Sequence, residues 1–362
     1  MRRADLRLAG LLAMAAYAVV VAAVAVLALR STPDAAASGV PDPPAVSATA
    51  APDAELVSVD VEQGATADMI ARQLLDAGAI TDAERFTLLL RFTGIGAELK
   101  AGPYDFAPGT PAIEVIRRMR AGETSERLVA IPEGRRVEEV GLLLVDEGIV
   151  SWLEWLDAIE EPWTHPVLDG RPEGAGLNGY LFPASYPFNR TTTAEEAVTA
   201  MLDSLEAALD QDPTLRADIE ASGMTLYEVL TLASIVEREA VVKEERPVIA
   251  SVFLNRLQDS IPLQADPTVQ YAITEQSGSA TSDWWKVELT VDDLAFDSPY
   301  NTYLYPGLPP GPIANPGLDA ITAVVRPAET DYLYFVARGD GSHAFAETLE
   351  EHNANVAEYR GE

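Results

Sequence analysis

The chain of 362 residues contains no cysteine. Disulfide bonds, thiolate zinc sites, cysteine nucleophiles and a lipid-modified N-terminal cysteine are therefore excluded. Histidine is scarce, and His165, His343 and His352 lie far apart in sequence without the H-E-x-x-H spacing of a metal-binding helix. We therefore expect neither a metal site nor a cofactor.

Basic residues are few as well. The 25 lysines and arginines stand against 57 aspartates and glutamates, which gives a formal charge of −32 at pH 7. A chain of this charge repels phosphate backbones and offers no basic stripe, so nucleic acid is not an expected partner. The 48% hydrophobic content and the length indicate a folded protein with two or three domains.

One long apolar run lies near the N-terminus. Residues 8–29 are uncharged and mostly apolar, and three arginines precede them. About 20 apolar residues span a bilayer, whereas the core of a signal peptide is about 7 to 15 residues long. We expect a cytoplasmic segment at residues 1–7, an uncleaved anchor at 8–29, and the bulk of the chain on the extracytoplasmic side of the cell membrane. A long signal peptide cleaved at "AAASG" is the alternative, and it also exports the chain.

Residues 30–55 are rich in Pro, Ala and Ser and predict an extended tether. Beyond it, "VDVEQGATADMIARQLLDAGAI" combines a short strand, a glycine turn, an amphipathic helix and a glycine stop. The pattern recurs 70 residues later in "VAIPEGRRVEEVGLLLVDEGIV". We interpret residues 56–124 and 125–176 as two α+β modules that resemble LysM modules and serve as spacers or bind glycan.

Residues 177–362 change in character, with long helical patterns joined by loops rich in Pro, Gly and aromatic residues, and with "YLYFVAR" alternating as a strand. We expect a mixed α/β catalytic domain here. The whole chain is therefore predicted to be α+β, with a transmembrane helix, LysM-like modules and this third domain.

The segment "TLYEVLTLASIVEREA" predicts a helix that begins with a T-x-x-E capping box. Its apolar stripe ends at Glu237, a position where a charge costs free energy unless it is paired or protonated. The small residues Ala233 and Ser234 leave room beside Glu237 for a ligand. Glu239 points about 200° away around the helix, and we expect it to be solvated or salt-bridged.

Two loops carry polar and aromatic side chains suited to sugar hydroxyl and acetamido groups, "PLQADPTVQYA" and "SPYNTYLYPGLPPGPIANPG". A purely structural Pro/Gly loop is the alternative. Asp266 is as well suited to cap the following helix as to contact a substrate.

Eight motifs occur in the order of one known family: "IPEG", "GYLFP", "ASIVEREA", "ASVFLNRL", "LQADPTVQYA", "SPYNTY", "GLPPGPIANPG" and "YLYFVARGDGSHAFAETLEEHN". Over roughly residues 56–360 the chain resembles the endolytic murein transglycosylase, or YceG-like, family. The resemblance implies a single-pass envelope enzyme that cuts nascent peptidoglycan strands between MurNAc and GlcNAc and leaves 1,6-anhydroMurNAc ends. Peptidoglycan strands, the cytoplasmic membrane and peptidoglycan synthases are the implied partners.

The same resemblance implies that Glu237 is the catalytic acid, and that the cleft residues are Gln264, Asp266, Thr268, Tyr271, Asn301 and Tyr303. One carboxyl suffices for such an enzyme, because the 6-hydroxyl of the sugar attacks the anomeric carbon in place of water. Burial on the apolar stripe is then expected to raise the pKa of Glu237. His343 and the "EEHN" motif also match the family, where packing or helix termination is the alternative.

The chain departs from the family pattern at "LNGYLFPASY", where Asn178 and Ala184 stand in place of acids. If the first acid assists catalysis in relatives, this chain has only an amide for the task. A non-catalytic peptidoglycan-binding or scaffold protein of the cell-wall synthesis machinery is therefore the alternative function.

Overall fold

The structure, a computed structural model, describes residues 56–277, 284–286 and 288–361. These residues form two compact units, which divide between Glu126 and Arg127; residues 189–191 belong to the first unit. The anchor predicted at 8–29 and the tether predicted at 30–55 lie outside the described residues.

The first unit is built on an antiparallel pair of strands, β1 (Val57–Val61) and β2 (Gly102–Phe106), with Val57 opposite Phe106. Three helices accompany the pair: α2 (Ala67–Asp76), α3 (Ala83–Thr93) and α4 (Ala112–Ala121), with a 3-10 turn at Gly96–Glu98. Their apolar faces enclose a core of their own. Strand β1 and helix α2 lie where the sequence predicts a strand and an amphipathic helix.

The second unit opens with the same order of elements: β3 (Arg127–Ala130), α5 (Val137–Asp146), α6 (Trp152–Glu160) and β4 (Ser185–Phe188). Strands β3 and β4 pair antiparallel, as β1 and β2 do. Both ends of α5 fall 70 residues after those of α2, so the predicted repeat is confirmed. The resemblance of the modules to LysM stays a prediction.

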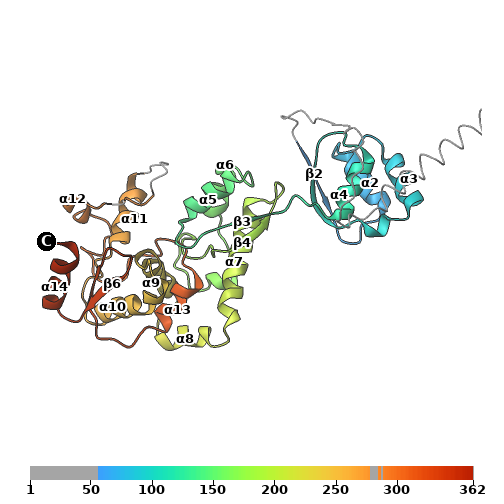
Figure 1. Cartoon of the computed structure of the whole chain (residues 1–362). Coiled ribbons are helices and arrows are strands. Elements are labelled where there is room, and N and C mark those ends of the chain that lie inside the picture. The colour runs from blue at the N-terminus through green and yellow to red at the C-terminus, as the bar shows by residue number, and fades with distance from the viewer. Residues whose placement is uncertain (1–55, 278–283, 287, 362) are drawn as a thin grey trace, which may run out of the picture. The chain divides into compact units, whose positions relative to one another are not determined.

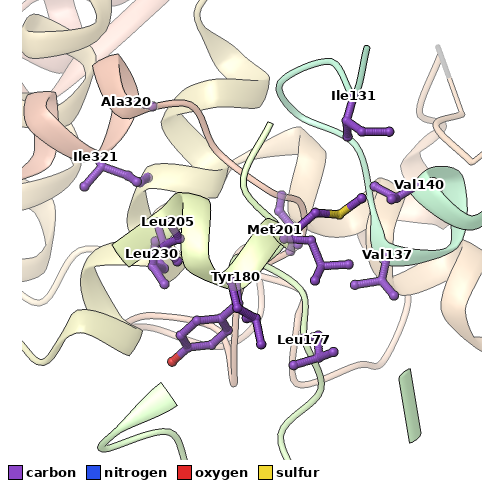
Figure 2. Close-up of a cluster of buried hydrophobic side chains, with 14 of the residues drawn as sticks. Ile131, Val137, Val140, Leu177, Tyr180, Met201, Leu205, Leu230, Ala320 and Ile321 are labelled. Atoms are coloured by element: carbon purple, nitrogen blue, oxygen red, sulfur yellow. The ribbon is translucent and has the colours of Figure 1, made fainter. Parts of the chain in front are cut away.

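The end predicted for the second module, at residue 176, precedes the strand that completes it. Because β3 pairs with β4, the chain on both sides of that position belongs to one compact unit. The buried cluster in Figure 2 shows the consequence, since side chains from the residue after β3, from α5, from the segment before β4 and from three later helices share one core. Its labelled members are Ile131, Val137, Val140, Leu177, Tyr180, Met201, Leu205, Leu230, Ala320 and Ile321.

The rest of the second unit is mixed α and β, as predicted. Its helices are α7 (Ala194–Gln211), α8 (Leu215–Ser222), α9 (Leu226–Glu239), α10 (Arg246–Gln258), α11 (Asp266–Ser277), α12 (Val291–Leu294), α13 (Leu318–Val325) and α14 (Leu349–Arg360). A hairpin of β5 (Tyr334–Ala337) and β6 (His343–Ala346) completes it, with 3-10 turns at Pro166–Leu168 and Lys243–Glu245. Helix α9 packs against α10, α11 and α13, while α14 packs on the hairpin (Figure 1).

Within the described ranges, no single helix has the length and apolar character needed to cross a membrane. Helices α8 and α9 meet those criteria only as a pair bent by 97°.

Asn315 ties three of the family motifs together. Its side-chain oxygen accepts hydrogen bonds from the backbone N–H groups of Gly179, at 2.8 Å, and Leu181, at 3.0 Å. Its amide nitrogen donates to the carbonyl of Arg135 at 2.9 Å. The residue is fully buried, so the two N–H groups depend on its side chain for a partner, whereas the Arg135 carbonyl also accepts from the Asn315 N–H at 2.8 Å.

We expect Asn315→Ala to lower the free energy of unfolding by about 2–4 kcal/mol, because the two buried N–H groups of Gly179 and Leu181 lose their partner. Chemical denaturation followed by tryptophan fluorescence measures the change. Asn353→Ala, at an exposed position of α14, is the control and should shift the stability by no more than about 0.5 kcal/mol. Equal stability of the two variants would contradict the role assigned to Asn315.

Candidate active site

Helix α9 holds the two glutamates in a fixed orientation. Thr225 and Glu228 form the predicted capping box, with the Thr225 hydroxyl accepting from the Glu228 N–H at 3.2 Å and the Glu228 carboxylate accepting from the Thr225 N–H at 2.8 Å. Every residue of α9 from Val229 to Val236 is buried. The last turn therefore presents Glu237 and Glu239 to two different surroundings.

Glu237 is enclosed by protein donors. Its side chain is 6% exposed, one carboxylate oxygen accepts from Arg246 Nη2 at 2.5 Å, and the other accepts from the Gly317 N–H at 3.1 Å. Burial raises the pKa of Glu237, as predicted, while Arg246 and the Gly317 N–H oppose that rise. Both oxygens are thus committed inside the protein, and neither is free to donate a proton to a sugar.

The room predicted beside Glu237 is occupied by the chain itself. The hydroxyl of Ser234 accepts a hydrogen bond from the Ile313 N–H at 3.0 Å. A Cβ atom at Gly317 would lie 2.2 Å from the carboxylate of Glu133, so this glycine permits the close approach. Arg246 also contacts Glu133 at 3.3 Å, which extends the buried ion pair into the "IPEG" loop. The geometry therefore assigns Glu237 a structural position.

Glu239 faces a cleft of about 360 Å³ instead. The cleft is lined by Glu239, Arg256, Leu263, Gln264, Asp266, Tyr303, Phe335, Val336, Ala337, His343, His352, Val356 and Arg360. Glu239 is half-buried, and its carboxyl has no recorded hydrogen bond or ion pair with any residue that the structure describes. The prediction of a solvated or salt-bridged Glu239 is therefore wrong, because the β5–β6 hairpin and α14 enclose this side of the helix.

The surroundings of Glu239 favour its protonated form. Burial raises its pKa to about 8, and the nearby negative charge of Asp266 adds to the rise, whereas Arg238 and Arg256 oppose it. At neutral pH this carboxyl therefore carries a proton in much of the population. A protonated, uncommitted carboxyl in a cleft is the group that general acid catalysis needs.

Three of the six predicted cleft residues line this cleft: Gln264, Asp266 and Tyr303. The hydroxyl of Tyr303 donates to the Asp266 carboxylate at 2.6 Å and fixes its orientation. Gln264 has a φ of +50°, a left-handed conformation that is uncommon for residues with a side chain. This strained backbone sets the direction of the exposed Gln264 side chain, which lines the same cleft as Glu239.

The other three lie outside the cleft lining and shape the loops. Thr268 is buried and donates to the Ala265 carbonyl at 2.7 Å. Asn301 donates to two backbone carbonyls of the preceding loop, at 3.0 and 2.8 Å. The ring of Tyr271 packs against Tyr300, with centroids 4.7 Å apart, and under the Arg136 guanidinium. The polar groups of these three residues therefore have partners within the protein, and their presence in the loops does not require a bound sugar.

Asn178 also belongs to this supporting structure. Its oxygen accepts from the Val137 N–H at 2.9 Å, and its amide donates to the Tyr271 hydroxyl at 3.3 Å. Ala184 contributes its carbonyl to the Ile131 N–H at 2.8 Å. Neither residue lines the cleft, so the exchange of acids for these residues does not alter the cleft lining.

The sequence analysis did not select four cationic or titratable residues that line the cleft: Arg256, His343, His352 and Arg360. Arg256 is buried and donates to the carbonyls of Leu333, at 2.6 Å, and Leu263, at 2.8 Å. The spacing of His352, Val356 and Arg360, four residues apart, places them on one helix face and was a usable signal.

A second cluster of charged groups joins His165, Asp203 and Glu206. The Nε2 atom of His165 lies 3.0 Å from the Asp203 carboxylate, while its Nδ1 accepts from the Val167 N–H at 3.2 Å. Because an accepting Nδ1 leaves the proton of a neutral imidazole on Nε2, the nitrogen facing the acids is a donor. We assign this cluster to a hydrogen bond, not to a metal site.

Comparison with known proteins agrees with the motif order. Residues 59–358 match the family model of the YceG-like family. An endolytic murein transglycosylase of Bacillus subtilis (strain 168) is 32% identical over 317 residues, which cover 84% of this chain and 84% of that protein. One of Streptococcus pneumoniae (strain ATCC BAA-255 / R6) is 31% identical over 329 residues, covering 84% of this chain and 58% of that protein.

The crystal structure of a yceG-like protein from Listeria monocytogenes is similar in fold, with a TM-score of 0.54 and 32% identity over 83% of this chain and 99% of that chain. The match of the family model spans both compact units and the cleft. With this span and these identities, the chain belongs to the YceG-like family.

Proposed function

We propose that the protein is a peptidoglycan lytic transglycosylase, with Glu239 as the acid that drives cleavage. Two of its relatives are named endolytic murein transglycosylase. The observation that carries the proposal is the uncommitted carboxyl of Glu239 in the cleft, with a pKa of about 8. Sugar-binding clefts of such enzymes need one group of this kind when the substrate supplies its own nucleophile.

The reaction balances with one carboxyl. Protonated Glu239 gives its proton to the oxygen that joins C1 of MurNAc to GlcNAc, and the C1–O bond breaks. The 6-hydroxyl of the same MurNAc forms the new bond to C1 and closes the 1,6-anhydro ring. The proton of that hydroxyl returns to the Glu239 carboxylate, so the acid is regenerated and no water is consumed.

Asp266 is the second carboxylate of the cleft lining. Its carboxylate accepts a hydrogen bond from Tyr303, and its negative charge would stabilise positive charge developing at the anomeric carbon. The same bond lowers the capacity of Asp266 to activate water. Anhydro ends are therefore the expected products, whereas reducing ends would identify Asp266 as a base for hydrolysis.

The placement of the reaction follows from the sequence. An anchor at residues 8–29 and a tether at 30–55 would hold the cleft near the outer face of the cytoplasmic membrane, where strands are synthesised. Internal cleavage there would end strand elongation and bring the protein close to peptidoglycan synthases. The position of Asn178 outside the cleft removes the main support for a non-catalytic binding protein.

We expect Glu239→Gln to reduce the formation of 1,6-anhydro ends at least about a hundredfold while leaving the fold intact. Mass spectrometry of products from nascent strands measures this. Glu237→Gln is the matched comparison: it removes the charge that pairs with buried Arg246 and should lower the free energy of unfolding by about 3–5 kcal/mol, with a much smaller loss of cleavage per folded molecule than Glu239→Gln causes. The reverse pattern would return the catalytic role to Glu237.

The rate of cleavage should fall as the pH rises through about 8, where Glu239 loses its proton. Asp266→Asn removes a negative charge that raises this pKa, so its alkaline limb should lie at lower pH. Stability should follow the same group: because the pKa of Glu239 in the folded state exceeds its ordinary value of 4.5, its contribution to stability is complete below pH 4.5 and is lost as the pH rises through about 8. Unfolding of Glu239→Gln should therefore vary less over this range; identical pH profiles in all three proteins would refute the assignment.

A further inference from the structure

We propose that the face of α14 in the cleft binds a carboxylate carried by the lactyl group of MurNAc, with Arg360 as its main ligand. The inference rests on the proposed function and extends it to the choice of substrate. Two groups of the substrate can supply this carboxylate: the free lactyl acid of a strand without peptide, or the acids of a peptide attached to the lactyl group.

The position of α14 supplies the first argument. The helix packs on β5 and β6, and the residues of it that line the cleft are His352, Val356 and Arg360. They are four residues apart, so they form one continuous face of the helix. Glu239 and Asp266 line the same cleft. A sugar whose glycosidic oxygen lies at Glu239 would therefore be bound in the cleft that this face of α14 lines.

Two groups on that face lack partners within the described residues. Arg360 is exposed, and none of its guanidinium N–H groups has a recorded hydrogen bond or ion pair there. The Nδ1 atom of His352 is buried without a hydrogen-bond partner, while its ring stacks on Tyr334 with centroids 5.3 Å apart. A buried polar atom without a partner is costly and indicates a missing ligand or water.

The cleft lining carries two arginines, Arg256 and Arg360, and one carboxylate, Asp266, besides the protonated Glu239, although the chain as a whole is strongly acidic. Arg256 and Arg360 both lie close enough to His352 to lower its pKa, together with burial. Arg256 contributes charge, but its guanidinium is already bound to the carbonyls of two neighbouring loops. Arg360 is thus left to form the paired N–H···O bonds that guanidinium groups make with carboxylates.

The substrate carries acidic groups that could pair with Arg360, and they lie close to the bond that is cleaved. The sugar rings of the strand are uncharged, and the acids belong to the substituent on the 3-oxygen of MurNAc. That substituent is attached to the same ring whose C1–O bond Glu239 would cleave. In a cleft of about 360 Å³, a ring bound at Glu239 therefore places its substituent next to the cleft wall.

The test uses the full-length chain in detergent and three strand preparations of equal length. One carries stem peptides, one has free lactyl carboxylates after removal of the peptides, and one has those carboxylates converted to neutral methylamides. Binding and the rate of anhydro-end formation are measured for the wild type, Arg360→Gln, Arg360→Lys and Arg216→Gln. Arg216, paired with Asp210 outside the cleft, is the control for loss of one positive charge.

We expect the wild type to bind and cleave at least one carboxylate-bearing strand about tenfold better than the methylamide, mainly through KM. Arg360→Gln should lose this preference, Arg360→Lys should keep part of it, and Arg216→Gln should keep it in full. The two carboxylate-bearing preparations identify the source. A preference that survives in Arg360→Gln, or its absence in the wild type, would overturn the inference. Absence of anhydro ends from every strand would instead contradict the proposed function, and the binding data would still decide the role of Arg360.

Discussion

The buried ion pair between Glu237 and Arg246 sets the geometry on which the cleft depends. It joins the last turn of α9 to the start of α10, and through Glu133 and the Gly317 N–H it reaches two loops that are distant in sequence. Ion pairs of this kind add little net stability over apolar packing, but removing one partner is costly. Their benefit is a single arrangement of the segments they join. Here that arrangement fixes the direction in which α9 ends.

A fixed helix end separates residues that are two positions apart. Glu237 and Glu239 point to opposite sides of α9, and their carboxyl groups therefore have different chemistry although burial raises the pKa of both. Donors occupy both oxygens of Glu237, which holds it as a carboxylate partner for Arg246. Glu239 has Asp266 nearby and no recorded donor among the described residues, so it retains a proton. A raised pKa alone does not identify the acid; access to the substrate does.

Local sequence patterns predicted the local structure well. The capping box of α9, the strand at β5 and the repeat that relates α2 to α5 are all confirmed. Each rests on contacts within a few residues or on a periodic pattern. The sequence favoured Glu237 over Glu239, whereas our proposal favours Glu239, because the choice depends on what covers each side of α9. That covering comes from residues 313–317 on one side and from 334–360 on the other, more than 70 positions away. Polarity likewise selected Thr268, Tyr271 and Asn301 correctly as hydrogen-bonding residues, but it could not distinguish a backbone partner from a sugar.

The distribution of charge gives the cleft its character. An acidic chain binds an anionic polymer only where the local field differs from the average, because charges further away than about 10 Å are largely screened at physiological salt. The cleft meets this condition with two arginines, Arg256 and Arg360, on the same lining as two carboxyls. In the proposed reaction, these two carboxyls, Glu239 and Asp266, act on the bond to be broken. The arginines balance the negative charge of Asp266 without ionising Glu239, since burial and Asp266 outweigh Arg238 and Arg256 in setting the pKa of Glu239. One small cleft thereby combines an acid that stays protonated with a surface that attracts an anionic strand.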